Sequence, residues 1–496
     1  MKLIATVYHD QSNIRLTYTG EVRLSDILAD AGLTQPHPCG GIGKCGKCAI
    51  RVAGDVSPLE ATEKEALQRA GYDPADGWRL SCLCTARGDV SLYYNTSKPA
   101  LQGLLAGFSK EFSLCPPCYG NGVGMAVDIG TTTVAAYLFD LSNGRLLDSA
   151  CRENPQRVHG ADVISRVGYA LSGGACELQH EIERCLDDLA RDMSDCAGVA
   201  APDTVVAVGN TAMLHLLTGT DPAPLAAAPF VMKRHFGEWE AGRYDAPCIS
   251  AYVGADMTAA ILSSDMCREG QTALLLDVGT NGEMALWHDG RLLCCSTAAG
   301  PAFEGAGISC GSLAVPGAVC AVTARDGLLC CETIDDQPPI GLCGTGLIDA
   351  TAALLEIGVL EDSGYMEEDA PLGDSGLTLT RADIRQVQLA KAAIRAGIDT
   401  LLHEAGVEYG DVDTVYLAGG FGSYLHPDSC AAIGMIPTAL IGKIKVLGNA
   451  AGQGASLMLL SKEELTKGEE IAKRATTLEL SSSMVFMEKY VDSMMF

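Results

Sequence analysis

The feature that most constrains the fold is an internal repeat, which begins at residue 125 and returns at residue 275. In each copy an apolar, strand-like run ends in an Asp-x-Gly-Thr turn, at Asp128 in the first copy and at Asp277 in the second. Each copy continues into a second strand-like run that closes in a polar turn, at Gly144 or Gly290. Two strand–turn–strand units of one design predict two similar lobes that face each other. Helical stretches alternate with strands in both halves, which is the α/β pattern.

Each Asp-x-Gly-Thr turn has the composition of a phosphate-binding loop. Glycine permits a tight turn, amides and hydroxyls can face phosphate oxygens, and the carboxylate can reach Mg²⁺ or its water. One such turn is most often only a turn, but two in the same frame indicate a nucleotide site. Two further glycine-rich turns fit this prediction, since a strand runs into Gly419 and Gly344 opens a helix whose N-terminus can receive an anion. The alternative is a glycine-rich α/β domain that binds no nucleotide.

Three cysteines lie within ten residues on a glycine-rich loop, at Cys39, Cys45 and Cys48. A [2Fe–2S] cluster takes three thiolates from one such loop and a fourth from a distant segment, although the first spacing here is five residues and not the plant-type four. Residues 78–82 resemble the segment of ferredoxins that holds the fourth ligand, so Cys82 is the predicted fourth ligand and Cys84 the reserve. The alternatives are buried free thiols or a zinc knuckle, and zinc sites usually contain two close cysteine pairs.

The first hundred residues predict a compact unit rich in strands around this loop. Strand-like runs occupy residues 3–8, 14–18, 48–52, 79–85 and 89–94, and helix-like runs occupy 24–31 and 63–70. Strands mixed with a helix and a Gly/Cys-rich loop indicate a β-grasp shape. We therefore expect a ferredoxin-like domain over residues 1–97, a connector over 98–123 and a two-lobed domain over 124–496. The role of Cys115 and Cys118 in the connector stays open.

Composition excludes several classes of function. The chain of 496 residues has a formal net charge of -27, so a nucleic acid backbone would be repelled. No run of 18 apolar residues is present, and the first residues read as a strand and not as a signal peptide, so we expect no membrane segment and a cytoplasmic location. The 21 cysteines are an odd number spread along the chain, which favours reduced thiols and a metal site over a disulfide framework.

The glycine turns and the two Asp loops together resemble the phosphate and adenosine loops of the actin-like ATPase superfamily, which includes sugar kinases and heat-shock chaperones. Residues 154–166, 209–215, 297–307 and 417–425 resemble sequence blocks of the reductive activators of corrinoid proteins. The resemblance covers residues 1 to about 95 and 124 to about 455. It implies an α/β and α+β multidomain chain, in which an N-terminal β-grasp ferredoxin precedes a two-lobed actin-like ATPase domain. It also implies ATP-dependent electron transfer that returns inactive Co(II) corrinoid to Co(I) in a methyltransferase system.

The resemblance also implies roles for single residues, with a [2Fe–2S] cluster, ATP and Mg²⁺ as cofactors. Asp128 corresponds to the metal-side carboxylate and Asp277 to the water-side carboxylate, while Glu283 and Glu304 follow the cleft motifs as candidates to assist water or metal. The implied cluster ligands are Cys39, Cys45, Cys48 and Cys82. The implied nucleotide-binding residues are Gly130, Thr131, Thr132, Thr133, Asn210, Gly279, Thr280, Asn281, Gly282, Gly344, Gly346, Gly419, Gly420 and Phe421.

The implied partners are a corrinoid protein of a methyltransferase system and a low-potential electron donor such as a ferredoxin or a flavodoxin. A homodimer is compatible with the resemblance, and no nucleic acid or membrane partner is expected. The sequence names neither the corrinoid protein and its methyl donor nor the electron donor. Since only about 30 residues separate the two predicted domains, we expect a short form that lacks the usual linker and middle domains.

Three other functions are compatible with the same motifs. The chain could be an ATP-driven electron donor to another low-potential enzyme such as a radical dehydratase, although those activators usually hold a cluster across a dimer of the ATPase domain itself. A small-molecule kinase with a regulatory ferredoxin domain would phosphorylate a sugar or an acid. A scaffold whose cluster senses redox state would leave the cobalt oxidation state unchanged.

Overall fold

The computed structural model describes residues 2–496 apart from residues 10–11, 32, 34–42, 44–47, 70–71, 73, 95–109, 118–121, 161, 280, 326 and 420–424. The chain forms two compact units. The first unit consists mainly of residues 1–98, and the second contains most of the remaining chain. Each unit has its own sheets and its own hydrophobic core.

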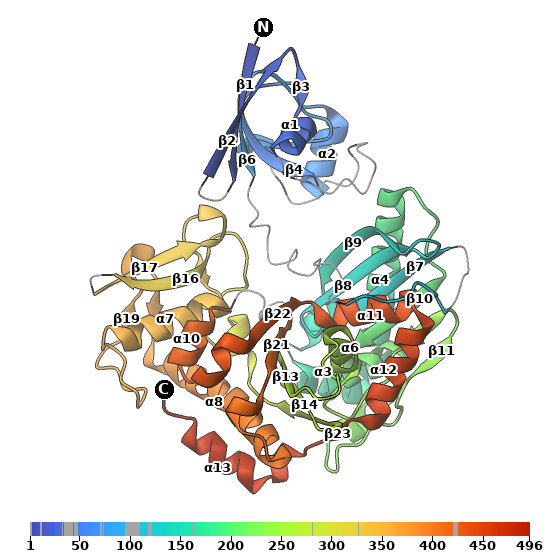
Figure 1. Cartoon of the computed structure of the whole chain (residues 1–496), viewed down its shortest axis with the longest axis vertical. Coiled ribbons are helices and arrows are strands. Elements are labelled where there is room, and N and C mark those ends of the chain that lie inside the picture. The colour runs from blue at the N-terminus through green and yellow to red at the C-terminus, as the bar shows by residue number, and fades with distance from the viewer. Residues whose placement is uncertain are drawn as a thin grey trace. The chain divides into compact units, whose positions relative to one another are not determined.

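The N-terminal unit is a mixed sheet with two helices (Figure 1). Its strands are β1 (Lys2–His9), β2 (Ser12–Thr19), β3 (Val22–Arg23), β4 (Ala49–Val56), β5 (Trp78–Leu80) and β6 (Thr85–Tyr94). They are ordered β2-β1-β6-β4-β5, with β3 paired to β6 and with β1 parallel to β6. Helix α1 (Leu24–Asp30) buries its apolar side against alternate residues of β1, namely Leu3, Ala5 and Val7. The sheet and the crossing helix confirm the predicted β-grasp fold class.

One predicted strand of this unit is wrong in its extent. The sequence predicts a strand over residues 79–85, but β5 ends at Leu80 and a turn follows. In this turn the main-chain N–H groups of Leu83 and Cys84 both donate to the carbonyl of Leu80, at 3.0 and 2.8 Å. The turn places Cys82 at a corner and starts β6 at Thr85 in a new direction. Alternating apolar residues hide such a turn in the sequence because its hydrogen bonds, and not its composition, break the strand.

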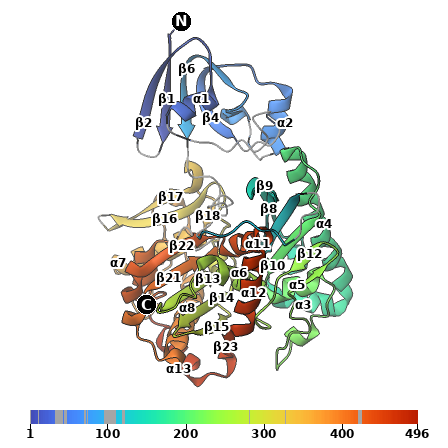
Figure 2. The same ribbon diagram turned by 45° about the vertical axis from the view of Figure 1, so that its right-hand side comes forward.

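The second unit contains two six-stranded sheets of one design. The first sheet has the order β11-β12-β10-β7-β8-β9. The second has the order β22-β21-β13-β14-β15-β23, and Figure 2 labels all of its strands. The first sheet comprises β7 (Val123–Ile129), β8 (Thr133–Asp140), β9 (Arg145–Glu153), β10 (Thr204–Gly209), β11 (Glu238–Glu240) and β12 (Arg243–Asp245). The second comprises β13 (Ala273–Val278), β14 (Gly282–His288), β15 (Arg291–Thr297), β21 (Thr414–Ala418), β22 (Ile444–Gly448) and β23 (Thr476–Thr477). In both sheets an antiparallel trio is extended by two parallel strands, which confirms the two predicted lobes.

Helices and smaller elements complete the two lobes. The helices are α3 (Val163–Tyr169), α4 (Ala175–Ala197), α5 (Thr211–Leu217), α6 (Ala255–Ser264), α7 (Gly344–Glu356), α8 (Arg381–Ala405), α10 (Pro427–Ala432), α11 (Ala450–Leu460), α12 (Lys462–Arg474) and α13 (Met484–Asp492). A three-stranded sheet of β16 (Ala318–Arg325), β17 (Leu328–Thr333) and β18 (Gly341–Leu342) and a hairpin of β19 (Ala370–Pro371) and β20 (Thr378–Leu379) belong to the second lobe. Short 3-10 helices follow β9 and β15 at matching places, η3 (Pro155–His159) and η6 (Pro301–Glu304).

The two lobes meet where α6 and α11 pack together (Figure 1). The backbones of these helices approach so closely that a Cβ on Gly454 would lie 2.1 Å from the carbonyl oxygen of Ala259. Ser263 Oγ donates to the carbonyl of Ala450 at 2.8 Å across the same contact. Glycine is therefore required at residue 454, because any side chain there would separate the helices. Among the described residues, no helix combines the length and the apolar character needed to cross a membrane.

Candidate functional site

Two thiols come together in the N-terminal unit. Cys48, just before β4, and Cys82, in the turn after β5, are buried, and their Sγ atoms lie 3.2 Å apart. Two thiolates on one tetrahedral metal with bonds of about 2.3 Å lie about 3.8 Å apart, so the pair fits a shared metal ion after a small adjustment. The pair belongs to a small core with Leu67 and Leu80, separate from the main core of the unit. The predicted ligands Cys39 and Cys45 lie outside the described residues.

The reserve ligand Cys84 occupies a different environment. It is part of the main core of the unit, in the cluster that contains Ala86 and Leu92. Burial raises the pKa of its thiol, which disfavours the thiolate that a metal requires. Ser57 Oγ lies 3.9 Å from its sulfur. These surroundings favour Cys82 over Cys84 as the fourth ligand.

A buried ion pair fixes the segment that carries Cys82. Arg79 donates to both carboxylate oxygens of Glu63, at 2.9 and 2.8 Å, and the N–H of Leu80 donates to the same carboxylate at 2.8 Å. Glu63 lies in α2 (Ala61–Arg69) and is 1% exposed, so the pair ties this helix to the end of β5. On the other side, Gly43 has a φ of +75° and lies against Leu83, where a Cβ would come within 2.2 Å of Cδ1. Sequence reasoning missed this ion pair because its two residues are far apart in the chain.

The two Asp-x-Gly-Thr aspartates end equivalent strands of the second unit. Asp128 is the penultimate residue of β7, and Asp277 is the penultimate residue of β13. Burial raises the pKa of Asp128 to about 7, the charge of Asp277 adds to the rise, and a hydrogen bond from Asn449 opposes it. Burial raises the pKa of Asp277 to about 6. Since one carboxylate acts on the pKa of the other, the structure brings the two predicted catalytic residues to one site.

Two further carboxylates lie at this site. Asp256, in the first turn of α6, has its pKa raised to about 8 by burial and by the charges of Asp128 and Asp277. Glu283 of β14 is paired directly opposite Asp277 in the strand ladder, and burial together with Asp256 and Asp277 raises its pKa well above the ordinary value. Sequence reasoning missed Asp256, because an acid in the first turn of a helix is already explained by the helix dipole.

The four acids suit a cation that arrives with its own ligands. Among the described residues, the metal-ligating side chains that converge to within 4.8 Å are His159, Glu177 and Glu181, and none of the four acids is in that group. His159 Nε2 and Glu181 Oε1 lie within hydrogen-bond distance, at 3.0 Å. Mg²⁺ is commonly bound through one or two carboxylates and the phosphates of a substrate, so it does not need a complete protein cage. The four acids therefore fit Mg²⁺ held jointly with a nucleotide.

The first loop, between β7 and β8, is held by two asparagines from other elements. Asn154 donates through Nδ2 to the carbonyl of Gly130 and through its main-chain N–H to the carbonyl of Thr132, both at 2.9 Å. Asn210 donates through Nδ2 to Thr131 Oγ1 at 3.0 Å. These bonds occupy acceptor atoms of the loop. Gly130 N–H donates to the carbonyl of Thr133, and the Thr132 hydroxyl donates to Glu304. The donor groups of Thr131 are therefore the ones suited to face an anion. Asn154 is fully buried and did not stand out in the sequence as a site residue.

The second loop, between β13 and β14, follows an aspartate that contacts the third glycine turn. The N–H of Gly279 donates to the carbonyl of Asn281 at 3.0 Å, and Gly282 begins β14. Gly419, with a φ of +85°, follows β21 so close to Asp277 that a Cβ would lie 2.6 Å from Oδ1. Both the backbone conformation and the space thus require glycine at residue 419. The predicted residues Thr280, Gly420 and Phe421 lie outside the described residues.

The fourth predicted turn opens α7. Gly344 is the first residue of this helix, and its N-cap Cys343 makes no side-chain cap hydrogen bond. Gly346 packs against β16, where a Cβ would lie 2.3 Å from the carbonyl oxygen of Val319. Packing alone therefore requires glycine at residue 346. A role of these two glycines in nucleotide binding stays a prediction.

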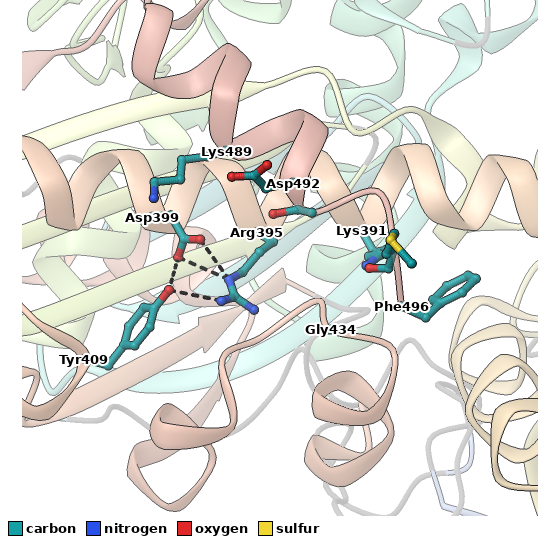
Figure 3. Close-up of a pocket in the computed structure, with 10 residues that line it drawn as sticks. Lys391, Arg395, Asp399, Tyr409, Gly434, Lys489, Asp492 and Phe496 are labelled. Atoms are coloured by element: carbon teal, nitrogen blue, oxygen red, sulfur yellow. Dashed lines mark hydrogen bonds and ion pairs between the residues drawn. The ribbon is translucent and has the colours of Figure 1, made fainter. Parts of the chain in front are cut away.

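A pocket of about 380 Å³ lies between α8, α13 and the turn at Tyr409 (Figure 3). Its polar groups mostly bind one another: Arg395 donates to Asp399 and to Tyr409, and Tyr409 donates to Asp399 at 2.5 Å. Lys391 donates to the main-chain carbonyl of Met495. None of the predicted site residues lines this pocket. We assign these contacts to the anchoring of α13 on α8.

A β-grasp unit with paired thiols, followed by two equivalent lobes that bring aspartates to one site, defines an iron–sulfur protein with an actin-like nucleotide-binding unit. Three family descriptions match the chain in the same order. Residues 7–87 match the 2Fe-2S iron-sulfur cluster binding domain, residues 123–269 match the RACo middle region, and residues 271–496 match the C-terminal domain of RACo, the ASKHA domain.

Relatives match the chain over most of its length. It is 33% identical to the corrinoid activation enzyme RamQ of Eubacterium limosum, with 96% of each chain covered. It is 28% identical to the [Co(II) methylated amine-specific corrinoid protein] reductase of Methanosarcina barkeri, with 74% of this chain and 76% of the relative covered. The solved structure of a reductive activator for corrinoid,iron-sulfur protein is 27% identical, has a TM-score of 0.69, and is matched over 99% of this chain and 98% of its own. The chain belongs to the family of reductive activators of corrinoid proteins.

The predicted absence of a middle domain is wrong. The middle region is present as residues 123–269, which contain β7 to β12 and α6. From the sequence we expected this region to be part of the ATPase domain, because it carries the first Asp-x-Gly-Thr turn. Since both lobes have the same strand order, a repeated motif cannot separate a middle region from the domain that follows it.

Proposed function

We propose that this chain uses ATP to transfer an electron from a [2Fe–2S] cluster to a corrinoid protein, reducing inactive Co(II) to Co(I). The observation that carries the proposal is that one chain combines the Cys48–Cys82 thiol pair with a site where Asp128 and Asp277 meet. The names of its full-length relatives, a corrinoid activation enzyme and a Co(II) corrinoid protein reductase, support the same reaction.

The cluster would be held by Cys39, Cys45, Cys48 and Cys82. When bound, it supplies a one-electron carrier of low potential. The chain contributes the fixed turn at Cys82, which the Arg79–Glu63 ion pair holds at the end of β5. The electron donor would be a low-potential carrier such as a ferredoxin or a flavodoxin.

The reason for combining a cluster with an ATPase is energetic. Plant-type clusters have potentials near −400 mV, and we expect the Co(II)/Co(I) couple of a corrinoid protein to lie lower still. Each ~59 mV of uphill one-electron transfer costs about 1.4 kcal/mol. Two or three such steps would leave about one transfer in a hundred to a thousand productive. ATP turnover can remove that deficit by shifting the population of docked states.

The two aspartates would divide the work on the nucleotide. Asp128, next to the first loop, would bind Mg²⁺ or its water, and Asp277 would orient the attacking water. Near neutral pH the raised pKa of Asp128, about 7, leaves part of its population protonated until a cation binds. Binding of Mg·ATP should therefore release a proton at this site.

The direct test follows cobalt by visible spectroscopy under anaerobic conditions. Reduced protein is mixed with a Co(II) corrinoid protein, with and without ATP. Co(I) that forms only with ATP is the expected result. If no Co(I) forms with several corrinoid proteins while the cluster is intact, the electron acceptor must belong to another class.

The ligand assignment has its own test, in which Cys82→Ser and Cys84→Ser are compared. Cys82→Ser should lose or strongly alter the visible absorbance of the cluster, and Cys84→Ser should leave the spectrum nearly unchanged. The opposite pattern would assign the fourth position to Cys84. Nucleotide binding, measured on both variants, should be retained.

A further inference from the structure

Arg166 is a buried cation directly behind the first phosphate loop. It lies in α3 and is 0% exposed. Its Nη2 donates to the carbonyl of Thr131 at 2.5 Å, and its Nε donates to the carbonyl of Gly160 at 2.9 Å. Its Nη1 lies 3.5 Å from the sulfur of Met213. The side chain thus links the loop to two other segments of the first lobe.

The loop is held at Thr131 from two sides. Arg166 donates to the carbonyl oxygen of Thr131, and Asn210 donates to the hydroxyl oxygen of the same residue at 3.0 Å. Asn210 is itself fixed, because its Oδ1 accepts from the N–H of Met213 at 3.0 Å and caps α5. With both acceptor atoms engaged, Thr131 has its donor groups available for an anion.

The charge of Arg166 has no close counterpart in the described part of the chain. No described carboxylate lies within ion-pair distance of its guanidinium, and Asp162, Glu181 and Glu304 act on it only from farther away. Burial lowers the pKa of Arg166 to about 10, so it remains charged at neutral pH. A buried charge without an ion-pair partner is costly, and a bound anion would offset that cost.

We propose that Arg166 is a positioning residue that makes the first loop selective for nucleotides over nucleosides. It orients Thr131 through the main chain and places positive charge behind the loop. A nucleotide phosphate on the other side of the loop supplies the missing negative charge, whereas a nucleoside cannot. This inference rests on the proposed ATP function and adds a residue and a selectivity to it.

The test compares Arg166→Met with the wild-type full chain in calorimetric titrations of ATP, ADP and adenosine. Methionine retains much of the packing volume but removes the charge and the bond to Thr131. ATP affinity should fall about 10- to 100-fold, the range for loss of a hydrogen bond to a charged group, while adenosine affinity changes less than about twofold. Arg166→Lys, which keeps the charge, should recover part of the ATP affinity.

The matched control is Arg184→Met. Arg184 lies in α4 of the same lobe and is exposed, so its removal should leave all three affinities unchanged. Equal losses for ATP and adenosine in Arg166→Met would reduce Arg166 to a structural residue and overturn the inference. If Arg166→Met does not fold, Arg166→Lys decides alone, because a purely structural role predicts equal losses for both ligands. A wild-type chain that binds no nucleotide would instead refute the proposed function.

Discussion

The two lobes of the second unit share a strand order but differ in how they build their phosphate loops. In the first lobe Ile129 pairs with Val134, so four residues separate the last pair of the ladder, whereas in the second lobe Val278 pairs with Gly282 and three residues separate it. The extra residue allows a turn in which Gly130 N–H donates to the carbonyl of Thr133 at 3.0 Å.

The same difference changes the neighbours of the two aspartates. Asp128 lies opposite Ala135 in its ladder, and Asp277 lies opposite Glu283. Two buried acids directly opposite each other disfavour ionisation. Burial and the neighbouring acids raise the pKa of Glu283 well above its ordinary value, so the second lobe accepts a cost that the first lobe avoids. The first lobe instead has the buried cation Arg166 behind its loop. We propose a division of labour, in which Asp128 of the first lobe serves phosphate and metal and Asp277 of the second lobe orients the attacking water.

The largest expected effect is a loss of ATP turnover that distinguishes the roles of the two aspartates. Asp277→Ala should lower ATP turnover by about 10²- to 10⁴-fold, the usual contribution of a group that positions or activates water, while nucleotide binding and the cluster spectrum remain. Asp128→Ala should mainly weaken the binding of Mg·ATP. ATP turnover is measured by phosphate release and nucleotide affinity by calorimetric titration, on both variants. If the two substitutions changed both quantities equally, the proposed division between the aspartates would be wrong.

The contact between the lobes gives the next effect. Gly454→Ala should destabilise the second unit by about 1–3 kcal/mol, because the new Cβ would lie 2.1 Å from the carbonyl oxygen of Ala259 and force α6 and α11 apart. Gly442→Ala is the matched control, since a Cβ at that exposed glycine meets no atom within 4 Å. Thermal melts should show a lower transition temperature for Gly454→Ala only. Equal shifts would mean that the helix contact is not tightly packed.

The raised pKa of Asp128 predicts a pH dependence of the nucleotide-free protein. Its folded-state value, about 7, lies above the ordinary value of 3.8, so the folded state holds the proton in a window where the unfolded state has lost it. Stability from this group therefore falls as pH rises from about 4 to about 7, by at most about 1.4 kcal/mol per pH unit. Asp128→Asn should flatten the pH profile of the melting temperature in this window, measured without divalent cations. An unchanged slope would contradict the raised pKa.

The smallest effect concerns the acid that only the second lobe has. Glu283→Gln removes a buried acid whose ionisation next to Asp277 is unfavourable, so the nucleotide-free protein should gain up to about 1 kcal/mol of stability as pH rises to 7 and above. ATP turnover should fall at the same time if this acid serves metal or water. Glu488→Gln, at an exposed glutamate of α13, is the control and should change neither quantity. If the Glu283→Gln variant keeps its ATP turnover, Glu283 has no role in catalysis and only lowers the stability of the fold.

Local patterns in the sequence predicted much of the fold. Apolar, strand-like runs followed by a glycine turn predicted β7 and β13, and the repetition of this pattern predicted two lobes of one design. The three-cysteine loop and the segment of Cys82 predicted a ferredoxin-like unit. Both predictions depend on residue types at a fixed spacing within a short segment, where residue type is informative. The same local reasoning failed at residues 81–83, where a strand was expected and a turn is present.

By itself the sequence determined the class of protein, because the residues that contact a cluster or a phosphate must have a particular chemistry at a particular spacing. Only the tertiary structure decided which distant groups surround these residues: Cys82 beside Cys48, Asn449 beside Asp128, and Arg166 behind Thr131. It also decided the one-residue difference between the two loops, which depends on strand register. Such contacts are set by how sheets and helices pack, and packing energy is shared by many residues, so no short motif encodes it.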